Sequence, residues 1–205
     1  LQVGRGGIYL NSGSINGNVY ASGDITASNS GSNAITGSAT AANSESLATD
    51  QSNGATGTPP SSISFGQANS TQDIAESFIV STEIPLSKVQ FYIKKTGSPS
   101  NATVRIVSDS SGSPGTSYLA TGTLSASLVG TPYGWVDTTF TTNPVLQTGT
   151  TYWLVIDAST SASNYYTVGA NTDGYTSGLS KTGQYSGSWT TIASSLDSYF
   201  KIYLG

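Results

Sequence analysis

The sequence predicts an all-β protein: a jelly-roll-like β-sandwich preceded by a short β-solenoid-like or extended stalk. Three observations support this fold class. After residue 60, strand-like segments alternate with Gly, Pro, Asn and Ser at regular spacing. Residues 1–60 repeat weakly with a period of twenty residues. The chain also shows no convincing helical periodicity, so strands are expected throughout.

The predicted stalk, residues 1–60, consists of Gly, Ser, Asn, Ala and Thr with isolated Ile and Val. The segments Ile15–Gly17, Ile35–Gly37 and Ala55–Gly57 recur at twenty-residue spacing. A β-solenoid needs coils of this kind, because each coil turns at Gly or Asn and stacks small apolar residues inward. The alternative is an irregular, low-complexity linker.

The predicted sandwich covers residues 61–205. Pro59 and Pro60 mark the boundary, because paired prolines continue neither a helix nor a strand ladder. All three Trp, all five Phe and ten of the twelve Tyr follow it. A core of the size that a sandwich needs is therefore expected only in this second part.

The strands of the sandwich are predicted from alternation and composition. Val89, Phe91 and Ile93 alternate with polar positions, as expected of a strand with one buried face. Residues 152–156 are apolar on both faces, so this strand should be central and covered twice. The full set of candidate strands is 75–81, 86–95, 102–108, 117–124, 134–141, 150–157, 164–169 and 196–204.

Several of these segments together resemble a known domain. The segments are 89–93, 104–106, 109–115, 146–156, 164–166 and 200–203, with Trp189. They are similar to a repeating jelly-roll domain of secreted bacterial surface and phage-associated proteins. That resemblance implies a non-catalytic sandwich on a large extracellular protein and supplies no ligand. Residues 15–19 resemble the Ile-x-Gly-Asn-Val segments of bacterial pilus-associated and polymer-forming surface proteins.

Composition argues against most enzyme classes. The chain has no His and no Cys, so it has no imidazole base, no thiolate and no sulfur ligand for a metal. Only 9% of the residues are charged and the net charge is −4. Seven cations are too few for a nucleic-acid surface. No apolar run approaches the length of a membrane span. An extracellular or cell-surface protein is therefore expected.

Calcium is the one metal that the composition favours, because it takes oxygen ligands only. The loop that begins at Asp109 suggests such a site, and Asp157 and Asp173 are the other candidate ligands. The alternative for an Asp-Ser-Gly loop is an ordinary turn. No other cofactor is expected.

Aromatic residues in the Gly- and Ser-rich stretch 158–195 are candidates for binding sugars, because a flat ring stacks on the apolar face of a pyranose. The candidates are Tyr165, Tyr166, Tyr175, Tyr185 and Trp189, with Asn164 as a hydrogen-bonding neighbour. The alternative is that these rings close the end of the sandwich core.

Together these features predict a non-catalytic structural or adhesive module of a cell-surface appendage, filament or fibre. Its expected partners are other copies of the chain or other surface proteins. The alternative function is a carbohydrate-binding module, with a glycan as its partner.

Overall fold

The computed structural model describes residues 2–3, 8–10, 13–21, 25–27, 34–41, 48–192 and 195–205. The chain forms two compact units, Leu1–Ser46 and Leu47–Gly205, here called the coil unit and the sandwich unit. The described residues form strands and one short 3-10 helix, η1 (Asn69–Thr71). The predicted all-β fold class is confirmed. None of the described segments is a helix long and apolar enough to cross a membrane.

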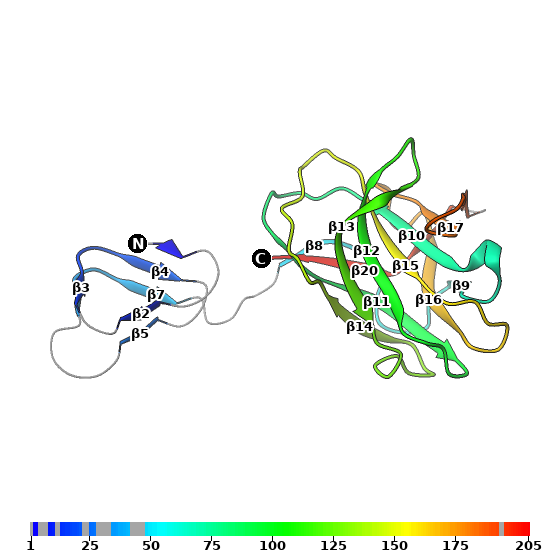
Figure 1. Ribbon diagram of the computed structural model, residues 1–205, viewed down its shortest axis with the longest axis horizontal. Coiled ribbons are helices and arrows are strands. Elements are labelled where there is room, and N and C mark those ends of the chain that lie inside the picture. Colours follow the sequence, from blue (N-terminus) through cyan, green and yellow to red (C-terminus); the bar gives the residue numbers. More distant parts are fainter. Residues whose placement is uncertain are drawn as a thin grey trace. The chain divides into compact units, whose positions relative to one another are not determined.

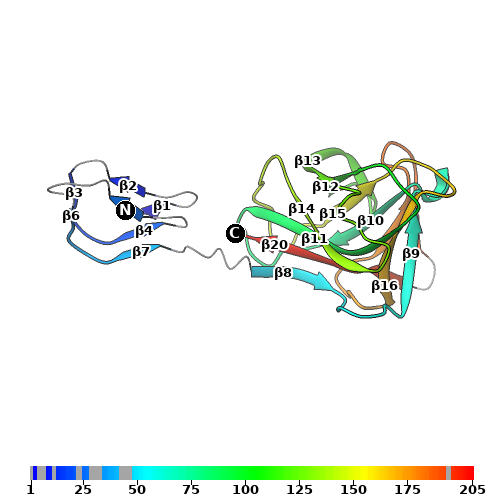
Figure 2. The ribbon, with the colours of Figure 1, turned by 90° about the horizontal axis from the view of Figure 1, so that it is seen from below.

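The described residues of the coil unit form seven short strands in three parallel sheets, and Figures 1 and 2 show these sheets. The sheets have the orders β1-β4-β7, β2-β5 and β3-β6. Successive coils thus contribute parallel strands to each sheet in turn, which is the arrangement of a β-solenoid. The strands are β1 (Gln2–Val3), β2 (Ile8–Leu10), β3 (Ser14–Ile15), β4 (Val19–Ala21), β5 (Ile25–Ala27), β6 (Ala34–Ile35) and β7 (Ala39–Ala41).

The register of the coils explains the twenty-residue repeat. Ile15 pairs with Ile35 and Val19 pairs with Ala39, so equivalent residues lie above one another. Gly37 is required at its corner, since a Cβ there would lie 2.6 Å from the carbonyl carbon of Gly17. The coil interior is a small apolar cluster of Ile8, Val19 and Ala21, with Leu10, Ile15, Ile25 and Ile35 packed against it.

Polar side chains join the coils at the same corner. The Thr36 hydroxyl donates to Asn16 Oδ1 at 2.7 Å, and the Ser38 amide donates to Asn18 Oδ1 at 3.0 Å. These bonds satisfy backbone and side-chain groups that would otherwise be left unpaired where the chain turns. The Asn and Thr of the repeat are therefore structural.

The third predicted copy of the repeat is wrong. Ala55–Gly57 lies in the sandwich unit, where the Thr56 hydroxyl accepts a hydrogen bond from the Trp135 indole at 3.2 Å. The coil before Ile15 was missed instead, because Gln2 pairs with Tyr20 and Ile8 with Ile25 at spacings shorter than twenty. A coil of different length interrupts the twenty-residue period in the sequence, but its strands still pair with those of the next coil.

The sandwich unit consists of two antiparallel sheets that face one another (Figures 1 and 2). One is six-stranded, with the order β13-β12-β15-β10-β17-β18. Its strands are β10 (Asp73–Phe78), β12 (Ala102–Asp109), β13 (Pro114–Leu124), β15 (Tyr152–Asp157), β17 (Ser180–Gly183) and β18 (Trp189–Thr191).

The second sheet is seven-stranded. It has the order β19-β16-β11-β20-β8, with β14 paired to β11 and β9 paired to β16. Its strands are β8 (Ala48–Asn53), β9 (Ser61–Phe65), β11 (Leu86–Thr96), β14 (Gly134–Thr139), β16 (Tyr165–Thr172), β19 (Leu196–Ser198) and β20 (Phe200–Leu204).

Every predicted strand overlaps an observed one, and four observed strands were missed: β8, β9, β17 and β18. All four consist mainly of polar residues. Only β9 alternates, and its alternation is limited to Ile63 and Phe65, which is too little to mark a strand in sequence. The omission of β8 also misplaced the domain boundary. Because β8 pairs with β20, the sandwich unit begins at Leu47 and not at residue 61.

The main core fills the space between the two sheets. Val89, Phe91 and Ile93 of β11 point into it, as their alternation predicted. The terminal strand adds Phe200 and Ile202, and the facing sheet supplies Ile74, Phe78, Leu154 and Ile156. The sandwich is thus held by alternate residues of both sheets.

The second face of β15 is also covered. Trp153 and Val155 form a separate apolar cluster with Ala75 and Val107 on the outside of the six-stranded sheet. Tyr185 and Trp189 pack over this cluster and leave Trp153 only 1% exposed. The prediction of a central strand buried on both faces is confirmed.

We expect Trp153→Ala to destabilise the sandwich unit by about 3–5 kcal/mol, because it opens a cavity in the outer cluster. The substitution also leaves Asp109 without the indole hydrogen bond that it accepts at 2.7 Å. Chemical denaturation followed by far-UV circular dichroism measures the effect. Leu128→Ala, at a position 64% exposed, is the control and should unfold like the wild type. A Trp153→Ala protein as stable as this control would contradict the buried position.

Candidate functional site

The outward presentation predicted for two of the candidate aromatic residues is wrong. Tyr166 is 1% exposed, stacks on Phe65 with ring centroids 5.6 Å apart, and donates its hydroxyl to the Ser100 carbonyl at 2.6 Å. Tyr175 lies edge-on to Phe200 at 5.0 Å, and burial raises its pKa to about 12. Both rings close the sandwich core, which was the alternative reading.

The other candidates are half-buried and lie in different places. Tyr165 starts β16, whereas Tyr185 and Trp189 belong to the β17–β18 hairpin, which forms one edge of the six-stranded sheet. Asn164 accepts the Ser98 amide at 2.8 Å and donates to the Ser161 hydroxyl at 3.1 Å, so it fixes two loops. The six predicted residues therefore do not form one site.

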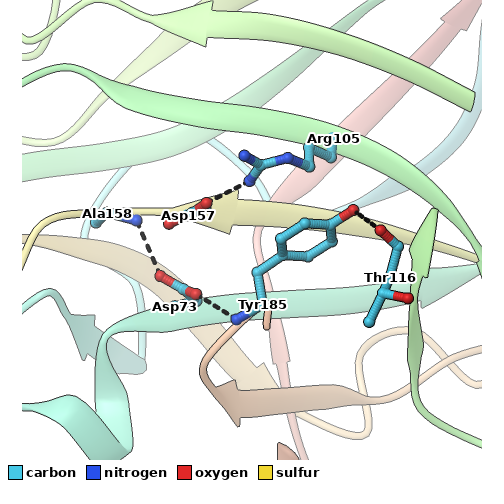
Figure 3. A network of polar contacts seen from close by, with 6 residues as sticks. All are labelled: Asp73, Arg105, Thr116, Asp157, Ala158 and Tyr185. Carbon is cyan, nitrogen blue, oxygen red and sulfur yellow. Dashed lines mark hydrogen bonds and ion pairs between the residues drawn. The ribbon is translucent and has the colours of Figure 1, made fainter. Parts of the chain in front are cut away.

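Tyr185 belongs to a polar network on the outside of the six-stranded sheet (Figure 3). Its amide donates to Asp73 at 2.6 Å, and its hydroxyl donates to the Thr116 carbonyl. The Arg105 guanidinium lies 4.2 Å from the centre of its ring and pairs with Asp157. Every residue drawn in this network contacts another, so the network fixes the turn between β17 and β18 against the outer face of the sheet.

The three candidate calcium ligands lie apart. Asp109 ends β12, while Asp157 pairs with Thr103 near the other end of that strand, roughly 20 Å away. Asp109 accepts the Gly112 amide at 3.0 Å, and Ser111 and Gly112 have positive φ, so the loop is an ordinary turn. Asp173 follows β16 in the other sheet. Among the described residues, no three acidic side chains gather in a way that could hold a metal ion.

Carboxylates of the described part are committed to structural bonds. Apart from Asp173, every described carboxylate accepts at least one hydrogen bond from within the fold. Four of them are those of Asp50, Asp73, Glu83 and Asp197. Asp73, for example, accepts the amides of Ala158 and Tyr185, and burial raises its pKa to about 6 despite those bonds. The remaining members of this set are Glu76, Asp109, Asp137 and Asp157.

Glu76 is the most deeply buried carboxyl group. It lies between the sheets, 2% exposed, and its Oε2 accepts the Ser198 amide at 2.9 Å and the Ser198 hydroxyl at 2.8 Å. Burial raises its pKa to about 8. The adjoining cavity, between Glu76, Phe91 and Leu154, measures only about 10 Å³. This space is too small for a substrate.

The sandwich unit carries a different aromatic site on the outside of the seven-stranded sheet. Tyr92 of β11 lies nearly parallel to Tyr133, with centroids 5.5 Å apart, and contacts Trp135 of β14 at 5.2 Å. A groove of about 410 Å³ opens here, which we call the aromatic groove. It is lined by Thr56, Gly57, Thr58, Tyr92, Lys94, Thr131, Pro132 and Tyr133.

Hydrogen bonds fix the rings beside this groove. The Tyr92 hydroxyl donates to the Gly57 carbonyl and accepts the Gly57 amide, both at 2.9 Å. The Trp135 indole donates to the Thr56 hydroxyl at 3.2 Å. Tyr133 and Trp135 are half-buried, so part of their apolar ring surface reaches solvent in a fixed arrangement.

Three lysines lie over the rings of this face. Lys94 Nζ is 4.7 Å from the centre of Tyr133, and Lys201 Nζ is 4.1 Å from the centre of Trp135. Lys88 Nζ lies 4.9 Å from the centre of Tyr203. An ammonium group held over a ring is attracted by its electron-rich face. The site combines ring surface, hydroxyl groups and positive charge.

The sequence contained one signal for this site, which was not followed. Tyr92 and Lys94 alternate with the buried positions of β11, and an aromatic residue on the solvent side of a strand needs a reason. Trp135 and Lys201 could not be assigned to the same face, because strand order decides which residues meet across a sheet.

In comparisons with known proteins, no family model matches this sequence, and none of the curated proteins matches it.

The buried acids should make the sandwich unit more stable as the pH falls. Because the pKa of Glu76 rises from 4.5 to about 8 on folding, the folded protein binds more protons than the unfolded chain between these values. The free energy of unfolding therefore decreases as the pH rises through this window. Asp73 adds the same trend between 3.8 and about 6.

We expect Glu76→Gln to remove most of this dependence between pH 6 and 8, because glutamine resembles the neutral acid. The midpoint of urea unfolding, followed by Trp fluorescence, measures it. Asp137→Asn is the control: hydrogen bonds from Lys88 and Gln90 outweigh the desolvation of Asp137 and lower its pKa, so this variant should keep the wild-type slope in the window. Wild-type stability that rises from pH 6 to 8 would contradict the assignment.

Proposed function

We propose that this chain is a non-catalytic structural or adhesive module of a cell-surface appendage, filament or fibre, and that the coil unit is the part that assembles. The partner is a second copy of the chain. Residues 89–93 and 146–156, and the coil residues 15–19, resemble segments of secreted surface and polymer-forming proteins, which agrees with this proposal.

The main observation that supports assembly is the edge of the coil unit. Strand β7 pairs with β4 on one side only within the described residues, so one row of its backbone groups is open to another strand. Natural edge strands are usually protected by charge, proline or a bulge. Residues 34–41 contain no charged residue and no proline. Such an edge accepts a further coil by continuing the parallel ladder.

A non-catalytic role also fits the chemistry of the side chains. His and Cys are missing from the sequence, and the buried acids Asp73, Glu76 and Asp197 are used as acceptors for backbone amides. The alternative function, a carbohydrate-binding module built on loop aromatics, loses Tyr166 and Tyr175 to the core. The module is proposed to be extracellular and to require no cofactor.

We expect the full-length protein to form concentration-dependent oligomers, and Ser38→Lys with Ala39→Lys to abolish them. Both side chains are exposed at the coil edge, where two ammonium groups would have to be desolvated against the added coil. Sedimentation velocity over a range of concentrations, together with negative-stain electron microscopy, measures assembly.

The matched control is Ser127→Lys with Leu128→Lys, which adds the same charge at exposed positions of the sandwich unit. The control should assemble like the wild type. A wild-type protein that stays monomeric at every concentration, or an edge variant that still assembles, would refute the role of the coil edge.

A further inference from the structure

Two cations of the described chain are left without an oxygen partner by the fold. Lys88 and Arg105 form ion pairs with Asp137 and Asp157, and these are the ion pairs among the described residues. The remaining described cations divide into two groups. Lys95 donates to the Ala126 carbonyl at 2.6 Å, and Lys181 donates to the Gly112 carbonyl and the Ser113 hydroxyl. Lys94 and Lys201 only lie over aromatic rings.

Both of these lysines belong to the outer face of the seven-stranded sheet, beside the aromatic groove. Lys94 follows Tyr92 on β11 by two residues, so the two share a face. Lys201 of β20 lies opposite Gln90 of β11, and its ammonium group lies over Trp135. Two uncompensated positive charges thus gather on one face of a chain whose net charge is −4.

The rings hold these charges in place. Tyr133 and Trp135 both contact Tyr92, which is itself fixed by its two hydrogen bonds to Gly57. Because each lysine is seated on a ring of this cluster, less side-chain freedom is lost when an anion binds. The face is therefore organised before any ligand arrives.

The two lysines lie at different positions along the sheet. Lys201 lies beside Gln90, and Lys94 is four residues further along β11, a backbone separation of roughly 13 Å. The ammonium groups lie over two different rings that both contact Tyr92, so a ligand that pairs with both must reach across this ring cluster. Exposed hydroxyl groups of Thr56, Thr58 and Thr131 lie at the groove and can exchange hydrogen bonds with a polar chain.

We propose that the aromatic groove and its two free lysines bind an acidic polysaccharide, a sugar polymer that carries carboxylates at intervals. The rings offer apolar surface to the sugar, the threonines offer hydroxyl groups, and each ammonium group pairs with one carboxylate. A nucleic acid fits less well, because two cations on an acidic chain cannot neutralise a phosphate at every nucleotide. The proposal is independent of assembly through the coil unit.

The test uses the full-length protein and isothermal titration calorimetry. Hyaluronan oligosaccharides, in which every second sugar carries a carboxylate, serve as the acidic probe, and dextran of matched length is the neutral probe. We expect binding to hyaluronan that weakens with added salt, and no measurable binding to dextran. Equal binding of dextran, or no binding of hyaluronan at low salt, would overturn the proposal.

The decisive variant is Lys94→Gln with Lys201→Gln, which should weaken hyaluronan binding by about tenfold or more. Lys95→Gln with Lys181→Gln is the matched control, because it removes the same charge from lysines whose ammonium groups already donate hydrogen bonds within the fold. The control should retain binding within about threefold once equal thermal unfolding has been verified. Equal losses in both pairs would show a general charge effect and overturn the site.

A third variant separates ring contact from charge. Trp135→Leu keeps both lysines but removes the ring under Lys201, and it should weaken binding severalfold. Unchanged affinity would overturn the role of the rings. A single-stranded oligothymidine that binds more tightly than hyaluronan of equal charge would assign the face to nucleic acid instead. Assembly measured on the same samples distinguishes failure here from failure of the coil edge.

Discussion

Burial of strand β15 on both faces is the constraint on which the sandwich unit depends. Its inward residues, Leu154 and Ile156, complete the core between the sheets, and its outward residues, Trp153 and Val155, need a second cover. That cover is formed by the side chains of Tyr185 and Trp189 from the β17–β18 hairpin. Tyr185 is held in place by Asp73 through its amide and by Thr116 through its hydroxyl. The aromatic residues of the hairpin, which look in sequence like sugar-binding loops, are thereby used to close a core. The same demand explains why Arg105 and Lys181 lie over the Tyr185 and Trp153 rings on this side of the sheet.

Buried acids serve the fold in a second way. Asp73, Glu76 and Asp197 each accept a hydrogen bond from the backbone amide of another segment. The carboxylate oxygen thus serves as acceptor for an amide that is not paired with a backbone carbonyl of a neighbouring strand. Burial raises the pKa of all three. The cost is that ionisation of these groups at high pH opposes folding. A raised pKa therefore reports structural burial here, since the space beside Glu76 is too small to admit a ligand.

The two units leave different kinds of surface available. In the coil unit this feature is the backbone edge of β7, which pairs on one side only among the described residues and is built from small uncharged residues. In the sandwich unit it is side-chain chemistry: the rings of Tyr133 and Trp135 with the ammonium groups of Lys94 and Lys201. An unpaired strand edge favours pairing with a strand of another copy of the chain. Aromatic rings beside ammonium groups favour a polar polymer that carries negative charge. The proposed assembly and the proposed ligand binding therefore use separate surfaces of the chain.

The sequence alone determined the all-β class, most strand positions of the sandwich and the coiled nature of the N-terminal part. Those features are local, because alternation in Val89–Ile93 and recurrence of Ile15 and Ile35 depend only on neighbours along the chain. The polar strands β8 and β17 were missed because pairing partners, not their own residues, make them strands. The placement of Tyr166 in the core, and the meeting of Tyr92, Trp135 and Lys201 on one face, were decided only by the tertiary structure. The physical reason is that strand order joins residues more than a hundred positions apart, and no pattern within one strand records which strand will lie beside it.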